Sequence, residues 1–409
     1  NGLHDYIFLK EIFANVILLI MCFVFFYLRK FKIGKMDISY FFAVAFIFLI
    51  IFNNGDNKAY HTITMPCVTM IICWLIFIFL QKWNGWMEKF IKILIFFGLL
   101  HAFITWITFL FPSLYYSLVA PLFNNADIIS QYNNGWMPGL TPHYSTNGMY
   151  LGVVSSALLS LSISDKKNRV KNIAMFIFVF SALLLSGKRA HVLILAVVLF
   201  AIFMVCNLKD KGIKLIQIAL ILILIISLIV FASLIIPELS NFYERFISTI
   251  ESGDITLGRS DRFKIALDIF AENPLFGIGW RQILYEYQNI YGYIIDTHNI
   301  YIQLLAETGI FGTFLFVSFF AYCLIKTFKI NKIRLKNNIS NGDKIGNYIL
   351  FSLAIQLWFL IYGLTGNPLY DYQCLIPYVF SCAMITNINR SFTFKEKNSD
   401  LEIINEKRV

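Results

Sequence analysis

Three arginines in this sequence stand where their side chains could bind an anionic group. Arg189 lies in the polar sequence SGKRAH, between two long apolar runs. Arg259 and Arg262 are one helical turn apart in RSDRFKIALDIFAE, so they share one face of a predicted helix over 259–272. Arginine binds phosphate well because its planar guanidinium donates two hydrogen bonds at once. The three residues therefore indicate a site for a phosphate-bearing ligand.

A histidine further along the chain could take a proton from a hydroxyl group. Thr297 is the predicted N-cap of a helix that runs from His298 to about Lys326. The positive end of a helix dipole disfavours the cationic form of His298, so its imidazole can accept a proton near neutral pH. The N–H groups at this helix start would also attract an anion. Together with the arginines, His298 predicts a site that binds a diphosphate and deprotonates a hydroxyl.

The same predicted helix carries a polar stripe in its first turns. Polar residues recur there at every fourth position, namely Asn299, Gln303 and Glu307. Residues four apart lie on one face of a helix, and the rest of this helix is apolar. The stripe is therefore expected to point into a helix bundle or a cavity.

Each of these features also has an ordinary structural explanation. The cations of SGKRAH could lie at helix ends, where long basic side chains reach toward water. The arginines of the 259–272 helix could pair with its own aspartates, although surface pairs contribute only about 0–1 kcal/mol each. His298 could be an interfacial cap. The topology of the chain bears on which explanation holds.

The composition is that of a chain solvated mostly by lipid. Hydrophobic residues make up 58% of the 409 residues and charged residues 14%, against about 25% charged in soluble domains. Crossing the hydrocarbon takes about 20 apolar residues in a helix. Predicted spans lie near 11–28, 38–53, 63–80, 91–111, 146–164, 172–187, 190–207, 214–236, 308–326, 347–364 and 374–388. The expected fold is all-α, a polytopic transmembrane helical bundle of about 11–12 spans.

Lysine and arginine gather in every second connection between these spans, which assigns those connections to the cytoplasm. The net charge of +10 is therefore a topology signal, and no nucleic-acid partner is expected. The alternation places the C-terminus inside. The sequence predicts a single transmembrane domain over 1–390, followed by a disordered cytoplasmic tail over 391–409. With eleven spans the N-terminus lies outside, and a twelfth would bring it inside.

Two outward-facing features depart from a plain loop. Lys188 and Arg189 lie in a connection that the alternation assigns to the outer side of the membrane, where lysine and arginine are usually scarce. Positive charge in this place favours an anionic ligand. The largest outward loop spans 237–297 and contains the amphipathic 259–272 helix, which is expected to lie along the membrane surface. The sequence has neither a Walker A loop nor zinc-ligand spacing, and its seven cysteines show no paired spacing. No metal and no cofactor are predicted.

The sequence HNIYIQLLAETGIFGT resembles the signature of the O-antigen ligase and polymerase superfamily. The pair His298-Asn299 is followed after nine residues by Gly309, and after two more by Gly312. SGKRAH is similar to the arginine-containing turn of that family. The loop that begins at Gly258-Arg259 and ends in NPLFGIG is similar to its large outward loop. The resemblance covers about 183–315, and elsewhere it rests on hydropathy and the number of spans.

The resemblance implies a GT-C-like glycosyltransferase on the periplasmic face of the bacterial inner membrane. Donor and acceptor would be undecaprenyl-diphosphate-linked oligosaccharides, in contact with membrane lipid, and a chain-length regulator protein is a candidate partner. His298 would be the general base, and Arg189 and Arg259 would hold the lipid diphosphate and stabilise its developing charge. Further candidate ligands of the diphosphate are Lys188, Arg262 and Arg281.

Three functions remain open at this point. A polymerase would lengthen the glycan on its carrier lipid, and the richness in Phe, Ile, Asn and Lys favours it. A ligase would use the same motif to move the finished glycan onto lipid A-core. A transporter without chemistry usually has an internal repeat and charges near mid-membrane, and the sequence has neither feature.

Overall fold

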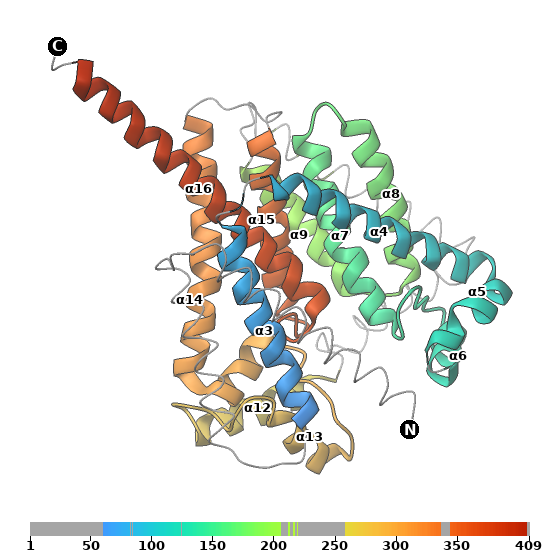
Figure 1. Cartoon of the computed structure of the whole chain (residues 1–409). Helices are drawn as coiled ribbons and strands as arrows, with labels where there is room; N and C mark the ends of the chain where they lie inside the picture. The colour runs from blue at the N-terminus through green and yellow to red at the C-terminus, as the bar shows by residue number, and fades with distance from the viewer. Residues whose placement is uncertain are drawn as a thin grey trace. The chain divides into compact units, whose positions relative to one another are not determined.

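The computed structural model describes residues 60–81, 83, 85–123, 125–205, 258–336 and 344–406, together with the single residues 212, 216 and 219. These residues form helices, turns and loops, and no strand occurs among them. The helices, labelled in Figure 1, are α3 (Tyr60–Leu80), α4 (Trp86–Leu110), α5 (Pro112–Leu118), η2 (Ala120–Leu122), α6 (Asn125–Asn133), α7 (Tyr144–Ser164), α8 (Arg169–Leu185), α9 (Arg189–Val205), α12 (Ser260–Glu272), α13 (Ile283–Tyr291), α14 (Ile300–Lys336), α15 (Lys344–Tyr362) and α16 (Tyr372–Glu406).

The chain divides into two compact units that alternate along the sequence. Unit 1 comprises Asn1–Met87, Asp261–Ile330 and Gly366–Val409, and unit 2 comprises Glu88–Ser260 and Asn331–Thr365. Unit 1 therefore contains α3, α12, α13, α16 and most of α14, whereas unit 2 contains most of α4, then α5 to α9, and α15. No single cut in the sequence separates the units, although the sequence predicts one domain over 1–390.

Unit 2 is built around α7, which packs against α8, α9 and α15 (Figure 1). The apolar window of α7 is 78% buried and that of α4 only 28%. α7 can be central because glycine, alanine and serine recur along it, and small residues let neighbouring helices approach without a hydrophobic driving force in lipid. α4 instead leaves Phe96, Phe97 and Phe103 exposed, as a lipid-facing helix would.

In unit 1, α3 packs along α16 (Figure 1). The carbonyl groups at the end of α3 have no partner within that helix and need donors from elsewhere. Asn387 of α16 donates to the carbonyl oxygens of Leu80 at 3.1 Å and of Trp83 at 2.7 Å. The indole Nε1 of Trp86 also donates to the Leu80 oxygen at 2.9 Å. One distant side chain, Asn387, and one nearby side chain, Trp86, thus satisfy the end of α3.

The structure confirms the helical, polytopic fold. Eight predicted spans coincide with helices, namely α3, α4, α7, α8, α9, α14, α15 and α16. Within the described residues, four helices are long and apolar enough to cross a membrane: α4, α7, α14 and α15. The predicted spans near 11–28, 38–53 and 214–236 lie outside the described residues, as does the part of the large loop over 237–257. The total of about 11–12 spans stays a prediction.

One prediction about the end of a helix differs from the structure. α16 continues to Glu406, where the sequence predicts a disordered tail from 391. Elongating a formed helix adds one hydrogen bond per residue, and this stretch contains several lysines and glutamates, which favour helix. The connection over 112–145 contains three short helices, α5, η2 and α6, around buried Tyr115 and Ile128. By contrast, the predicted 259–272 helix is confirmed as α12.

Candidate active site

The predicted site residues are divided between the two units. Lys188, Arg189 and Arg259 belong to unit 2. Unit 1 contains the others, namely Arg262, Arg281, His298, Asn299, Gly309 and Gly312.

In unit 1, the helix that follows His298 is interrupted. α14 carries a residue with non-helical dihedrals at Gly309, with φ 61° and ψ −167°, so it consists of a short first part and a long second part. The sequence predicts one continuous helix here, and that prediction is wrong. An interrupted helix loses backbone hydrogen bonds, which must be replaced if the groups are buried.

The segment Pro274–Gly279 replaces those lost hydrogen bonds. The N–H groups of Ile278 and Gly279 donate to the carbonyl oxygens of Ala306 and Glu307, both at 2.9 Å. On the other side of the break, the N–H groups of Ile310 and Phe311 donate to the oxygens of Pro274 at 2.9 Å and Leu275 at 3.3 Å. The two sequence motifs, NPLFGIG and HN…G…G, therefore form one interlocked structure.

The close approach of these two backbone segments requires a glycine in each of them. A Cβ atom added to Gly309 would stand 2.3 Å from the backbone carbon and oxygen of Leu275. A Cβ atom added to Gly277, which has φ 69°, would stand 2.4 Å from the carbonyl carbon of Glu307. Atoms cannot approach so closely, so one glycine of each motif, Gly277 and Gly309, has a steric explanation.

His298 occupies the turn before α14 with a left-handed backbone, at φ 59°. Within the described residues, the one other non-glycine residue with positive φ is Arg281, at φ 63°. Non-glycine residues in this region are uncommon, and strained backbone concentrates at functional sites. Both residues are among those predicted from the sequence to form the site.

Asn299, and not the predicted Thr297, caps α14. Its Oδ1 accepts hydrogen bonds from the N–H groups of Tyr301 at 3.1 Å and Ile302 at 3.2 Å. The Thr297 hydroxyl lies instead 3.2 Å from the Tyr287 hydroxyl. The cap therefore occupies two of the N–H groups that the sequence analysis expects to attract an anion.

Replacing Asn299 by alanine should destabilise the protein by ~1 kcal/mol, because two N–H groups at the start of α14 lose their acceptor. Thermal unfolding of the purified protein in detergent measures this loss. Asn299→Ser is the matched control and should stay close to the wild type, since serine caps as well as asparagine. Equal unfolding temperatures for the alanine and serine variants would contradict the capping role.

Two of the predicted phosphate-binding arginines instead contact Asp296, which stands two residues before His298. Arg281 Nη1 lies 2.6 Å from Asp296 Oδ1, and Arg262 Nη1 donates to the Asp296 backbone oxygen at 3.0 Å. Tyr287 also donates from its hydroxyl to the backbone oxygen of Arg262 at 2.7 Å. The loop that carries His298 is thus tied to both α12 and α13.

Two residues of the polar stripe, Gln303 and Glu307, are buried in α14 and have partners from a distant connection. Gln303 and Glu307 are both 0% exposed, and Gln303 Nε2 donates to Glu307 Oε1 at 2.8 Å. Asn367 donates to Gln303 Oε1 at 2.9 Å, and the Tyr370 hydroxyl donates to Glu307 Oε2 at 2.7 Å. Sequence reasoning missed Asn367 and Tyr370, because they lie more than 60 residues from their partners and form no local pattern.

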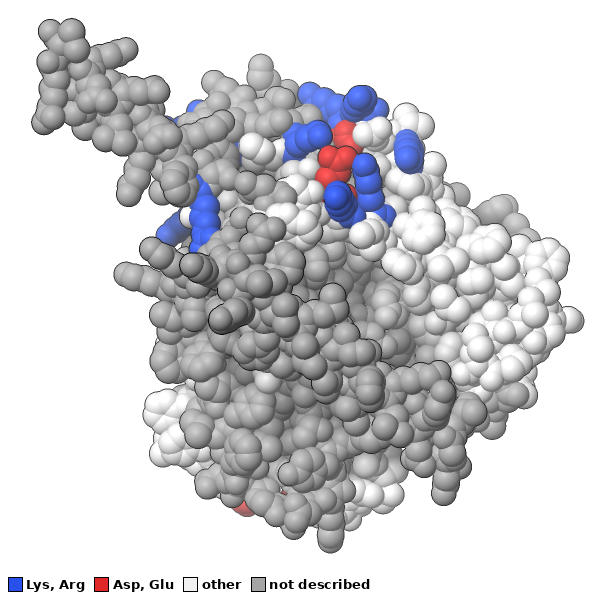
Figure 2. Space-filling view, in the orientation of Figure 1, with Lys and Arg blue, Asp and Glu red and all other residues white. Residues whose placement is uncertain are grey.

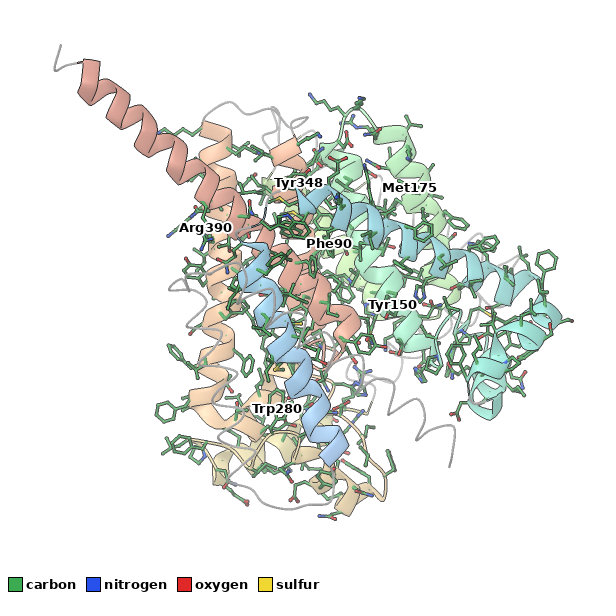
Figure 3. The ribbon with its side chains drawn as sticks, viewed as in Figure 1. Phe90, Tyr150, Met175, Trp280, Tyr348 and Arg390 are labelled. Carbon is green, nitrogen blue, oxygen red and sulfur yellow. The ribbon has the colours of Figure 1, made fainter. Side chains whose placement is uncertain are left out.

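Aromatic side chains pack against this polar cluster. Trp280, labelled in Figure 3, is 1% exposed and stacks on Phe316 with ring centroids 6.1 Å apart. Tyr370 meets Trp280 edge-on at 4.9 Å, and the Arg281 guanidinium lies 4.3 Å from the Tyr370 ring centroid. Burial in aromatic surroundings strengthens the charge interactions of Arg281 with its neighbours.

In unit 2, the turn between α8 and α9 presents Lys188 and Arg189. Gly187 makes this turn with φ 70°, and a Cβ atom there would stand 2.7 Å from the Trp136 ring. The ammonium of Lys188 lies 6.0 Å from the Tyr144 ring centroid, and Arg189 is the first residue of α9. His191 is 0% exposed and stacks on Trp358 with ring centroids 5.3 Å apart, so it belongs to the packed interior of unit 2.

Arg259 lies just before α12, in the part of the chain assigned to unit 2. Its Nη1 donates to the backbone oxygen of Thr365 at 3.0 Å. Residue Gly258 precedes it with φ 76°. Among the residues that the structure describes, no group of three or more His, Cys, Asp or Glu side chains could hold a metal ion.

These features define the class of the protein, a polytopic helical membrane protein with a polar site built on interrupted and capped helices. Residues 145–317 match a protein family described as O-Antigen ligase. This stretch contains every site residue predicted from the sequence, and the match confirms the resemblance to the O-antigen ligase and polymerase superfamily. It indicates an O-antigen ligase or polymerase type of function, in a family of glycosyltransferase-like enzymes. A comparison with curated proteins found no match.

Proposed function

We propose that this protein is a polymerase that joins undecaprenyl-diphosphate-linked oligosaccharide repeat units on the periplasmic face of the inner membrane. The observation that carries the proposal is His298, held with a left-handed backbone in the turn before α14, inside the region that matches the family. A histidine in a constrained turn beside a helix start is suited to accept a proton from a substrate hydroxyl.

The proposed reaction needs no further activated substrate. A hydroxyl of the acceptor glycolipid attacks the anomeric carbon of the donor glycan, and its proton passes to the His298 imidazole. The bond between that carbon and the diphosphate oxygen breaks, and its electron pair stays on the departing undecaprenyl diphosphate. Arg189 and Arg259 stabilise the charge that grows on this leaving group. Lys188 adds positive charge beside Arg189.

Two sets of contacts within unit 2 support the proposed orientation. Glu88 pairs with Lys92 at 2.8 Å and with Lys344 at 3.2 Å. The pair with Lys344 joins two connections that the distribution of lysine and arginine assigns to the cytoplasm. Figure 2 shows basic side chains gathered around acidic ones on this part of the surface. The hydrogen bond from Arg259 to Thr365 joins two connections that the rule assigns to the periplasm. A chain-length regulator protein stays a predicted partner.

Alanine at Arg189 or Arg259 should weaken binding of the lipid-linked donor by roughly 10- to 100-fold, the value of a charge-assisted hydrogen bond. Binding of a fluorescent undecaprenyl-diphosphate glycan to purified protein measures this. Arg169→Ala is the matched control, since Arg169 is exposed and lies in a connection assigned to the cytoplasm. Equal losses for Arg169→Ala and Arg189→Ala would contradict the assignment.

A ligase is the second candidate function, because the matching family is described as O-Antigen ligase. Deletion of the protein separates the two functions through the banding of lipopolysaccharide on a gel. Loss of a polymerase should leave a single repeat unit on the core. Loss of a ligase should leave bare core, with polymer retained on the carrier lipid. A transporter would bind the lipid-linked glycan without any turnover by the purified protein.

A further inference from the structure

Arg281 is predicted from the sequence as a ligand of the diphosphate, but its guanidinium is already surrounded in unit 1. The residue is 8% exposed. Its Nη1 lies 2.6 Å from Asp296 Oδ1, and its guanidinium lies 4.3 Å from the centroid of the Tyr370 ring. A ligand of a lipid diphosphate must offer its donors to that lipid, so these contacts favour a different role.

The charges around Arg281 hold it in its ionised form. Burial by itself lowers the pKa of Arg281, but the carboxylates of Asp296 and Glu307 outweigh burial and raise the pKa above its ordinary value. The Tyr370 hydroxyl bridges this group to the stripe of α14 through its 2.7 Å hydrogen bond to Glu307. Arg281 is thus the cation of a buried network that reaches from the α12–α13 connection to α14.

The network acts on the backbone that leads to His298. Arg281 holds the side chain of Asp296, and Arg262 holds its backbone oxygen at 3.0 Å. Thr297, between Asp296 and His298, is fully buried beside the Tyr287 hydroxyl. Left-handed backbone at a non-glycine residue persists only where its surroundings determine it.

We propose that Arg281 is a positioning residue, which through its ion pair with Asp296 fixes the 296–298 backbone and so presents the His298 imidazole to the acceptor. This inference rests on the proposed function of His298 as the base. Arg281 touches no reacting atom in this account, and its effect on transfer passes through the loop.

The test combines hydrogen exchange with kinetics on the purified full chain in lipid nanodiscs. Arg281→Gly removes the guanidinium and accepts φ 63° without strain. This substitution should speed hydrogen exchange of the amides over 296–300 by roughly 10- to 100-fold, because the free energy of a charge-assisted hydrogen bond is lost. It should also lower kcat. KM for the undecaprenyl-diphosphate-linked donor should stay within about threefold, since no donor contact is lost. Asp296→Asn, which is nearly isosteric, should reproduce both effects even if the glycine variant folds poorly.

Three other outcomes would each overturn the positioning role of Arg281. Unchanged exchange in both variants would overturn the positioning role. A rise in KM at unchanged kcat would overturn it too, because Arg281 would then bind the donor. Faster exchange at unchanged turnover would also overturn it, because the loop would then depend on Arg281 without affecting transfer; His298→Asn tests the proposed base separately. Arg189→Ala is the comparison variant and should weaken donor binding without altering exchange over 296–300.

Discussion

Replacing His298 by asparagine should abolish glycan transfer while leaving the protein folded. General-base catalysis contributes about 10²- to 10⁴-fold, so the glycan ladder in cells should disappear and turnover in vitro should fall by that factor. Asparagine is suited to the test because it tolerates a left-handed backbone better than most residues and cannot replace imidazole as a base near neutral pH.

Two further variants separate the imidazole from its backbone. His298→Gly also fits φ 59°, so it should fold and be as inactive as His298→Asn. His298→Ala removes the imidazole and adds backbone strain, so it should be inactive and also less stable. Membrane levels and thermal unfolding are measured beside the glycan ladder. Normal ladders from His298→Asn would refute the role of His298 as base.

Alanine at Gly309 should cause the largest loss of stability among the proposed substitutions. Gly309 has φ 61° and ψ −167°, a region that is essentially restricted to glycine and costs other residues ~1–3 kcal/mol. The added Cβ would also stand 2.3 Å from the Leu275 backbone, so the Pro274–Gly279 segment would have to move away. Four hydrogen bonds of the interlock would then be weakened together. The expected total exceeds about 3 kcal/mol.

Gly292→Ala is the matched control for this effect. Gly292 also has a left-handed backbone, at φ 80°, but a Cβ atom there would meet nothing within 4 Å. Its replacement should cost only ~1–2 kcal/mol of backbone strain. Thermal unfolding and gel filtration of both variants in detergent make the comparison. Equal stability of the two variants would show that the interlock contributes little.

Local patterns in the sequence predict much of the fold, because helices in lipid must be apolar and long. Hydropathy alone predicts the spans that correspond to α4, α7 and α15. Periodicity predicts the amphipathic helix α12. His298 was found through its motif and its place before a helix. These features depend on neighbours in the sequence, so the sequence alone contains them.

The parts that could not be predicted depend on residues far apart in the chain. Periodicity treats α14 as continuous, because the hydrogen bonds that permit its break at Gly309 come from Pro274–Gly279. Thr297 and Asn299 are both good caps, and only the left-handed turn at His298 determines which one serves. Arg281 has the residue type of a phosphate ligand, and its pairing with Asp296 is a tertiary contact that no spacing indicates.

Transfer by the purified protein in liposomes, supplied with undecaprenyl-diphosphate-linked repeat units and no nucleotide sugar, tests the proposed polymerase most directly. The wild-type protein should give a ladder of longer lipid-linked glycans with release of undecaprenyl diphosphate, and His298→Asn should give no ladder. Binding of the lipid-linked units without elongation by the wild-type protein would contradict the proposed polymerase.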